Sequence, residues 1–164
     1  LTAMHKPVIA MVHGAAAGAG LSIALAADFV IAAEGTRLSF AYSDIAGSGD
    51  AGITRSLPRL VGLRRALSIA MLGGNVRIDQ ALEWGLVSEV VAADELSARV
   101  QALANQLAAS HTCALGQIKQ LMRGSLDCTL NEQLQREYDA FLACAEQPAL
   151  AQAIDGFFSK RSAK

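Results

Sequence analysis

The chain of 164 residues has the length of one compact domain and can bury a substantial core. Hydrophobic residues make up 52% and charged residues only 18%, which is the opposite of the balance found in disordered chains. The net charge of -1 provides no broad attraction to nucleic acid or to an anionic membrane, so any anion site has to be local.

The cysteines and the apolar runs indicate a cytoplasmic chain without a membrane span. Cys113, Cys128 and Cys144 form no C-x-x-C motif and no Cys/His cluster, so neither a disulfide framework nor a metal site is expected. No apolar run reaches the ~18–20 residues that a membrane helix needs, and no signal peptide is visible. Leu1 and a strand-like run that follows almost at once predict a truncated chain.

The first quarter of the chain predicts alternating strands and helices. Residues 8–12 are a short apolar run of the kind found in strands buried on both faces, and residues 14–20 read as a loop of glycine and alanine. A helix is expected over residues 21–27, followed by strands over residues 29–32 and 37–40. This order indicates an α/β layer structure.

The middle of the chain contains a glycine-rich stretch and then returns to regular elements. Residues 41–56 lack apolar periodicity and predict a loop that can approach a ligand closely. A helix over residues 63–72 ends at two glycines. Asp79 is expected to cap a short helix, and residues 86–91 predict a further strand.

The last third of the chain is expected to be helical. Thr129 and Glu132 have the spacing of a capping box, and Pro148 suits the first turn of a final helix. The change of character predicts an α/β core over residues 1–109 and a helical region over residues 110–164.

The loop at residues 14–20 (GAAAGAG) carries small side chains that leave backbone N–H groups accessible to an oxyanion or a phosphate. Close packing of a helix on a strand is the alternative explanation. A dinucleotide fingerprint does not fit, because Ile23 stands where the third glycine belongs, and no phosphate-binding G-x-x-x-x-G-K-[ST] motif occurs.

Several motifs resemble the signature of the crotonase family, the enoyl-CoA hydratases and isomerases, and they follow in family order and spacing along nearly the whole chain. They are KPVIAMVHG at 6–14, AGAG at 17–20, LPRLVG at 57–62, A-x-x-x-GLVSEVV at 81–91 and F-x-x-KR at 157–161.

The resemblance implies a ClpP-like spiral of ββα units, incomplete at its N-terminus and followed by a helical trimerisation region. A homotrimer or a dimer of trimers is therefore expected. It also implies an acyl-CoA substrate, so that coenzyme A enters as part of the substrate and no cofactor is tightly bound.

The resemblance assigns roles to individual residues. The N–H of Ala19 maps to one oxyanion donor, with Gly18 and Gly20 beside it in the substrate pocket. Phe157 and Lys160 map to positions that meet the adenine and phosphate of coenzyme A; an aromatic core anchor and a solvated lysine are the alternatives.

The two glutamates of the family's hydratases map to Ser22 and Tyr42, so both carboxylates are absent and these side chains are expected to line the acyl pocket. Asp50 aligns with the aspartate of the isomerase branch, the branch that includes the isomerase of phenylacetate degradation. Gly49 and Ile53 depart from that branch's P-D-x-G-G pattern.

A single aspartate is enough to move a proton between two carbons, so the sequence favours an isomerase with Asp50 as the acid and base. A cap on the following helix is the structural alternative for Asp50. Asp44 is a competing base, and Asp28 is expected to make a structural hydrogen bond. Hydration by unusual residues, or a non-catalytic homologue, remains an alternative function.

Overall fold

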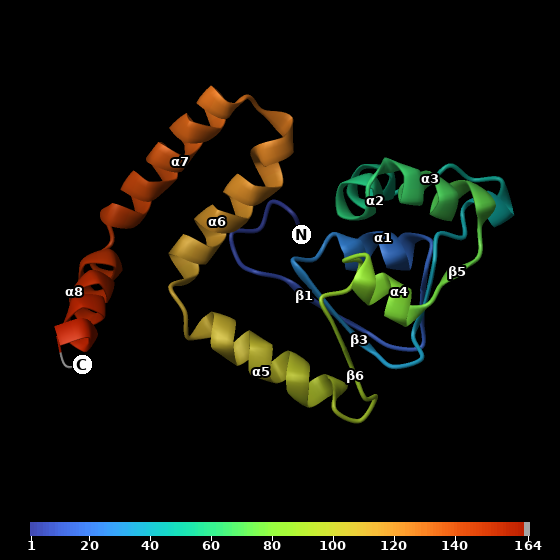
Figure 1. The fold of residues 1–164 in the computed structure, drawn as a ribbon, viewed down its shortest axis with the longest axis horizontal. Helices are drawn as coiled ribbons and strands as arrows, with labels where there is room; N and C mark the ends of the chain where they lie inside the picture. The colour runs from blue at the N-terminus through green and yellow to red at the C-terminus, as the bar shows by residue number, and fades with distance from the viewer. Residues whose placement is uncertain (163–164) are drawn as a thin grey trace. The chain divides into compact units, whose positions relative to one another are not determined.

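The computed structural model describes residues 1–162, with side chains described through Ser159. The chain divides into two compact units. The first comprises Leu1–Thr2 and Pro7–Gln106, and the second comprises Ala3–Lys6 and the chain from Leu107 onward. Each unit is described separately below (Figure 1).

The first unit contains a parallel sheet built from apolar strands. The strands β1 (Ile9–Val12), β3 (Phe29–Ala33) and β6 (Glu89–Val91) lie in the order β1-β3-β6. Ile9 pairs with Phe29, and the central strand β3 is buried along most of its length. Such burial explains why β3 is a continuous apolar run rather than an alternating pattern. The expectation that residues 8–12 form a strand buried on both faces is wrong, because β1 is at the edge of the sheet and leaves Met11 exposed.

The other three strands form a second sheet. The strands β2 (Ala15–Ala17), β4 (Arg37–Ser39) and β5 (Asn75–Val76) lie in the order β2-β4-β5, parallel in the first pair and antiparallel in the second. The first four strands therefore alternate between the two sheets, and a helix follows each pair β1–β2 and β3–β4. This is the repeat of a ββα spiral.

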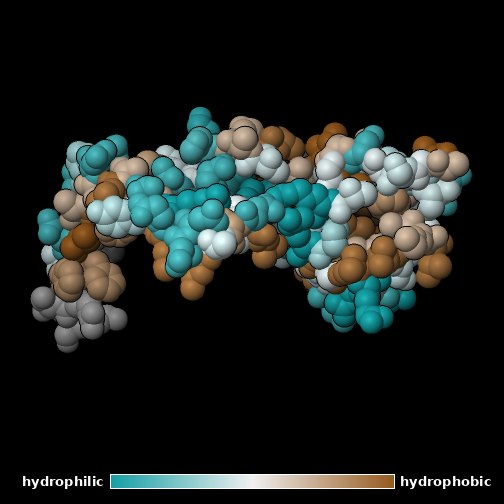
Figure 2. All heavy atoms as spheres, turned by 90° about the horizontal axis from the view of Figure 1, so that it is seen from above, coloured by the Kyte–Doolittle hydropathy of each residue, from teal (hydrophilic) through white to brown (hydrophobic). Residues whose placement is uncertain are grey.

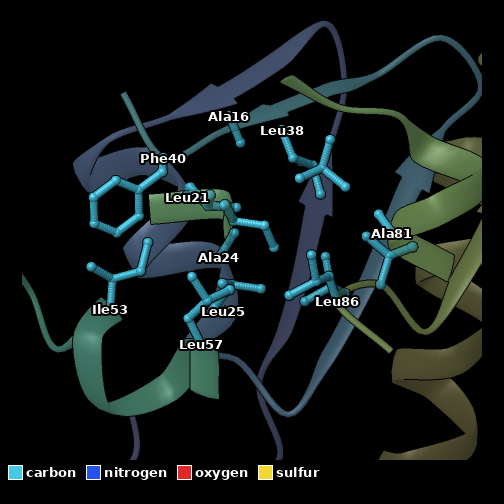
Figure 3. Close-up of a cluster of buried hydrophobic side chains, with 14 of the residues drawn as sticks. Ala16, Leu21, Ala24, Leu25, Leu38, Phe40, Ile53, Leu57, Ala81 and Leu86 are labelled. Atoms are coloured by element: carbon cyan, nitrogen blue, oxygen red, sulfur yellow. The ribbon is translucent and has the colours of Figure 1, made fainter. Parts of the chain in front are cut away.

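The helices of the first unit cover these strands and close its core. They are α1 (Ala19–Leu25), α2 (Ile53–Val61), α3 (Leu63–Leu72), α4 (Ile78–Glu83) and α5 (Leu96–Ala108), whose last two residues fall in the second unit. Figure 3 shows side chains from α1 and α2 meeting Phe40 in one cluster. Leu21, Ile53 and Leu57 are almost completely buried there.

The second unit consists of helices and the short segment of residues 3–6. Its helices are α6 (Thr112–Gly124), α7 (Leu130–Ala145) and α8 (Pro148–Ser162), with a 3-10 turn η2 (Ser125–Asp127) after α6. Lys119 Nζ donates to the Lys6 carbonyl at 3.1 Å and holds the segment against α6. The expected capping box of Thr129 and Glu132 is present, and Pro148 is the first residue of α8.

Large apolar side chains remain exposed on both units, where Figure 2 shows them as separate patches among polar surface. In the second unit they include a stripe along α7, at Leu130, Leu134, Tyr138 and Phe141. The four positions follow the three- and four-residue spacing of one helix face.

Four expectations in the first half of the chain are wrong in detail. The loop over residues 14–20 contains strand β2, whose only partner is the distant strand β4 among the described residues. The helix expected over 21–27 is α1, which begins at Ala19 and ends at Leu25. The strand expected over 37–40 ends at Ser39, and the loop expected over 41–56 includes a 3-10 turn η1 (Ser43–Ile45) and the first residues of α2.

Two expectations further along the chain also need correction. Asp79 does not cap α4, because the cap position is Arg77 and the Asp79 carboxylate instead pairs with the Arg77 guanidinium at 2.9 Å. The strand expected over 86–91 is the shorter β6, since Leu86 and Val87 bond back to the Ala81 carbonyl at the end of α4.

Candidate functional site

The junction between β2 and α1 presents an open backbone. Gly18 has a φ of 51°, a conformation that favours glycine, and its N–H donates to the Ser39 carbonyl at 3.1 Å. Ala19 is the first residue of α1, so its N–H has no acceptor within the helix. Ala19 and Gly20 are both exposed. The Ala19 N–H is thus placed where it can meet an external oxygen.

Three polar side chains form a hydrogen-bonded row beside this junction. Ser22, which is fully buried on α1, donates from Oγ to the Gly18 carbonyl at 3.1 Å. Ser22 Oγ lies 3.1 Å from the hydroxyl oxygen of Tyr42, and the Tyr42 hydroxyl donates to Oδ1 of Asp50. The row runs from a buried serine to an exposed aspartate. The structure therefore brings together Gly18, Ser22, Tyr42 and Asp50.

The ring of Tyr42 is fixed by packing from two directions. It meets Phe40 edge to face with ring centroids 5.0 Å apart. A Cβ added at Gly18 would lie 3.9 Å from Cζ of Tyr42, so the ring also lies against the glycine turn. Burial and the hydrogen bond to Asp50 both raise the pKa of Tyr42 above its usual value. Tyr42 is therefore protonated at neutral pH.

The loop that carries Asp50 has an unusual backbone. Ala41, Ala46 and Ala51 all adopt positive φ, at 58°, 55° and 47°, and they are the non-glycine residues that do so in the described chain. A left-handed alanine costs about 1–2 kcal/mol. The three strained alanines fall within residues 41–51, which include both Tyr42 and Asp50, and this concentration is typical of functional loops.

Asp50 does not cap α2. The cap position is Gly52, which makes no side-chain cap, and Asp50 contributes its backbone carbonyl to the N–H of Ile53 at 3.1 Å. The structural alternative raised for this aspartate is therefore wrong. Gly49 has a φ of 109°, which a proline cannot adopt, so its departure from the isomerase pattern reflects a different local backbone.

The other two aspartates of interest have different surroundings. Asp28 accepts a hydrogen bond from the N–H of Val8 at 2.8 Å, which confirms the expected structural role. Asp44 lies in η1, and its Oδ1 would be 3.1 Å from a Cβ added at Gly73. The Asp44 side chain thus faces the end of α3.

Phe157 and Lys160, the residues expected to contact coenzyme A, belong to α8 in the second unit. Phe157 is 58% exposed and meets Phe158 edge to face at 5.6 Å, so it is not a core anchor within this chain. The side chain of Lys160 lies outside the described residues.

Two further properties concern metals and membranes. Among the described residues, no group of three or more histidine, cysteine, aspartate or glutamate side chains could hold a metal ion. None of the helices in the described chain combines the length and the apolar character needed to cross a membrane.

The fold agrees with comparisons to known proteins. The enoyl-CoA hydratase/isomerase family matches residues 1–164. The 1,2-epoxyphenylacetyl-CoA isomerase of Escherichia coli is 38% identical over 99% of this chain, and the short-chain-enoyl-CoA hydratase of Clostridium acetobutylicum is 32% identical over 98%. A crystal structure of an enoyl-CoA hydratase/isomerase from Cupriavidus metallidurans has a TM-score of 0.94 at 32% identity over 97% of this chain.

The architecture is that of the crotonase superfamily, and the chain belongs to the enoyl-CoA hydratase/isomerase family. The chain spans only part of its relatives: it covers 62% of the E. coli isomerase, 62% of the Clostridium hydratase and 60% of the Cupriavidus chain. Relatives named as an isomerase and as a hydratase both match, so the comparisons identify the family and leave the reaction open between the two.

Proposed function

We propose that this chain belongs to an enzyme that shifts a double bond in an acyl-CoA thioester, with Asp50 as the proton carrier. The observation that carries this proposal is the row from Gly18 through Ser22 and Tyr42 to Asp50, which links the oxyanion turn to a carboxylate at the protein surface. Isomerisation needs both features: a donor for the thioester oxygen and one group that accepts and returns a proton.

In the proposed reaction, the Asp50 carboxylate removes a proton from a carbon of the acyl chain. The electron pair of the broken C–H bond moves into the conjugated system, and negative charge builds on the thioester oxygen. The Ala19 N–H donates to that oxygen, and removing one such donor typically costs ~10²–10³ in rate. Asp50 then returns the proton to a different carbon, so the double bond has moved and no atom has been gained or lost.

Hydration is the second candidate, since the Clostridium relative is named a hydratase. Water addition needs a base for water and an acid for the α-carbon. Tyr42 occupies one of the two glutamate positions, but its raised pKa keeps it protonated at neutral pH, and Ser22 is fully buried. Asp50 would have to serve alone, which favours the isomerase reaction.

The test is to incubate the full-length protein with a panel of enoyl-CoA thioesters and to follow both double-bond position and water addition. We expect a moved double bond without water uptake, and loss of this activity in Asp50→Asn. Asp44→Asn is the matched control and should retain turnover. Water addition would assign hydratase activity instead, and no reaction on any thioester would favour a non-catalytic homologue.

We also propose that the protein binds acyl-CoA, with Phe157 and Lys160 at the coenzyme A end, and that it assembles as a homotrimer or a dimer of trimers. The exposed stripe on α7 supports assembly, because large apolar side chains in a row gain from being covered. Acyl-CoA binding in preference to NAD or ATP, measured by calorimetry, tests the ligand. A cytoplasmic location and the absence of a tightly bound cofactor stay predictions.

A further inference from the structure

The row that connects Ser22, Tyr42 and Asp50 contains more polar contacts than it has protons to donate. Ser22 and Tyr42 each carry one hydroxyl hydrogen, and an ionised aspartate has none. Three contacts must be served: Ser22 with the Gly18 carbonyl, Ser22 with Tyr42, and Tyr42 with Asp50. With Asp50 ionised, two protons serve three contacts, and the carboxylate can only accept.

The proton count fixes the direction of the central bond. Because the ionised carboxylate of Asp50 is an acceptor only, the Tyr42 hydroxyl has to donate to it. Ser22 then has one proton to divide between the Gly18 carbonyl and the hydroxyl oxygen of Tyr42. A bond from a neutral hydroxyl to a carboxylate is charge-assisted and is the stronger member of the row.

We propose that Tyr42 is the positioning residue for Asp50: its hydroxyl holds Oδ1 so that Oδ2 exchanges the proton with the acyl chain. The inference rests on the proposed function and adds to it a residue that acts through Asp50. Asp50 needs such a constraint because it is exposed and stands on a loop with strained alanines on both sides. Tyr42 is suited to supply it, since its ring is packed between Phe40 and Gly18.

Ser22 has the supporting role of orienting the Tyr42 hydroxyl. It is fully buried on α1 and is bonded to the turn whose next N–H, that of Ala19, is the proposed oxyanion donor. Ser22 and Tyr42 thus connect Asp50 by hydrogen bonds to the turn that carries the proposed oxyanion donor. Burial raises the pKa of Tyr42, and the hydrogen bond to Asp50 raises it further, which agrees with a direct contact between the two side chains.

The kinetic test is a double-mutant cycle in the full-length protein. Tyr42→Phe keeps the ring and removes the hydroxyl, and we expect it to lower kcat by about tenfold while KM changes by less than about twofold. In the Asp50→Asn background the same substitution should have almost no further effect, because Tyr42 acts through Asp50. An equal loss in both backgrounds would overturn the proposal.

A spectroscopic test separates this inference from the proposed function, because it needs no substrate. The titration of the Tyr42 phenol is obtained as the difference between the protein and its Tyr42→Phe variant, in which Tyr138 and every other tyrosine cancel. We expect its ultraviolet titration midpoint to fall when Asp50→Asn is added; an unchanged midpoint would refute the contact between the two residues. If the midpoint falls but Asp50→Asn retains full turnover, the contact stands and the proposed function fails.

A second variant, Ser22→Ala, keeps the proposal testable if Tyr42→Phe fails to fold. Ser22→Ala leaves the Tyr42 hydroxyl in place but removes its buried neighbour, so kcat should fall by a smaller factor than in Tyr42→Phe, again only while Asp50 is present. A loss in Ser22→Ala that persists in Asp50→Asn would contradict the role given to the row.

Discussion

The substitution Gly49→Ala probes the loop that presents Asp50. Gly49 has a φ of 109°, and a Cβ there would lie 3.1 Å from Cγ2 of Ile53 and 3.2 Å from Cγ2 of Thr54. The Ile53 side chain is fully buried and cannot yield, whereas the exposed Thr54 can turn away. Alanine at this position is therefore destabilising for two reasons: its backbone is strained, and its methyl group clashes with the buried Ile53.

The expected cost follows from these two effects. An unfavourable backbone conformation costs about 1–3 kcal/mol, and a methyl group forced against a packed core adds about 1 kcal/mol or more. Replacing glycine also reduces the conformational entropy of the unfolded chain, which stabilises the folded state by only about 0.4–1 kcal/mol. Gly49→Ala should thus lower the free energy of unfolding by about 2–3 kcal/mol.

Urea unfolding followed by the fluorescence of Trp84 measures this change in the α/β unit. Trp84 is the single tryptophan of the chain and packs against the core cluster that contains Ile53. Gly52→Ala is the matched control: its φ of 83° is also unfavourable for alanine, but no atom lies within 4 Å of the added Cβ. If Gly49→Ala proves as stable as Gly52→Ala, the steric part of the reasoning is wrong.

Four further outcomes are expected. Asp50→Asn should lower isomerase turnover by about 10²–10⁴ with little change in acyl-CoA affinity, measured by steady-state kinetics and calorimetry. Gly116→Ala would place a Cβ 2.3 Å from the His5 carbonyl oxygen and should release residues 3–6 from α6, seen as faster amide exchange there, whereas Gly156→Ala meets nothing within 4 Å and should not. Thr129→Ala should cost about 1 kcal/mol of stability in urea; its partner Glu132 has a pKa lowered mainly by the Thr129 N–H, so the wild-type contribution is lost as the pH falls through that pKa. Light scattering of the full-length protein should give a trimer or hexamer, and a monodisperse monomer at micromolar concentration would contradict this.

Local signals predicted the elements whose boundaries are set locally. The helix over 63–72 matches α3 at both ends because the glycines at 62 and 73 terminate it on either side. The capping box at Thr129 likewise fixes the start of α7 without help from the rest of the fold. Strand β2 could not be predicted in this way, because three alanines carry no strand signal and their strand character comes from pairing with β4, about twenty residues further on.

The same distinction between local and long-range signals applies to the candidate site. The sequence pointed to Asp50 and to the Gly18–Gly20 turn through the family resemblance, and it assigned Tyr42 and Ser22 to the pocket. It did not indicate that Tyr42 bonds to Asp50, because the chain between them passes through Ala46 in a left-handed conformation. Alanine gives no hint of such a backbone, whereas Gly47 and Gly49 nearby were the available signal that the segment could turn back.

Strand β1 has a consequence for how the chain behaves at high concentration. It is the outer strand of its sheet, and β2 is the outer strand of the other, so two rows of main-chain groups face away from their sheets on the described chain. Beside them an open hollow of about 570 Å³ is lined by apolar side chains that include Met11 and Ile23. Unprotected strand edges template pairing between molecules. Encounters between copies of the isolated chain should therefore compete with refolding, and the yield of native protein should fall as the concentration during refolding rises.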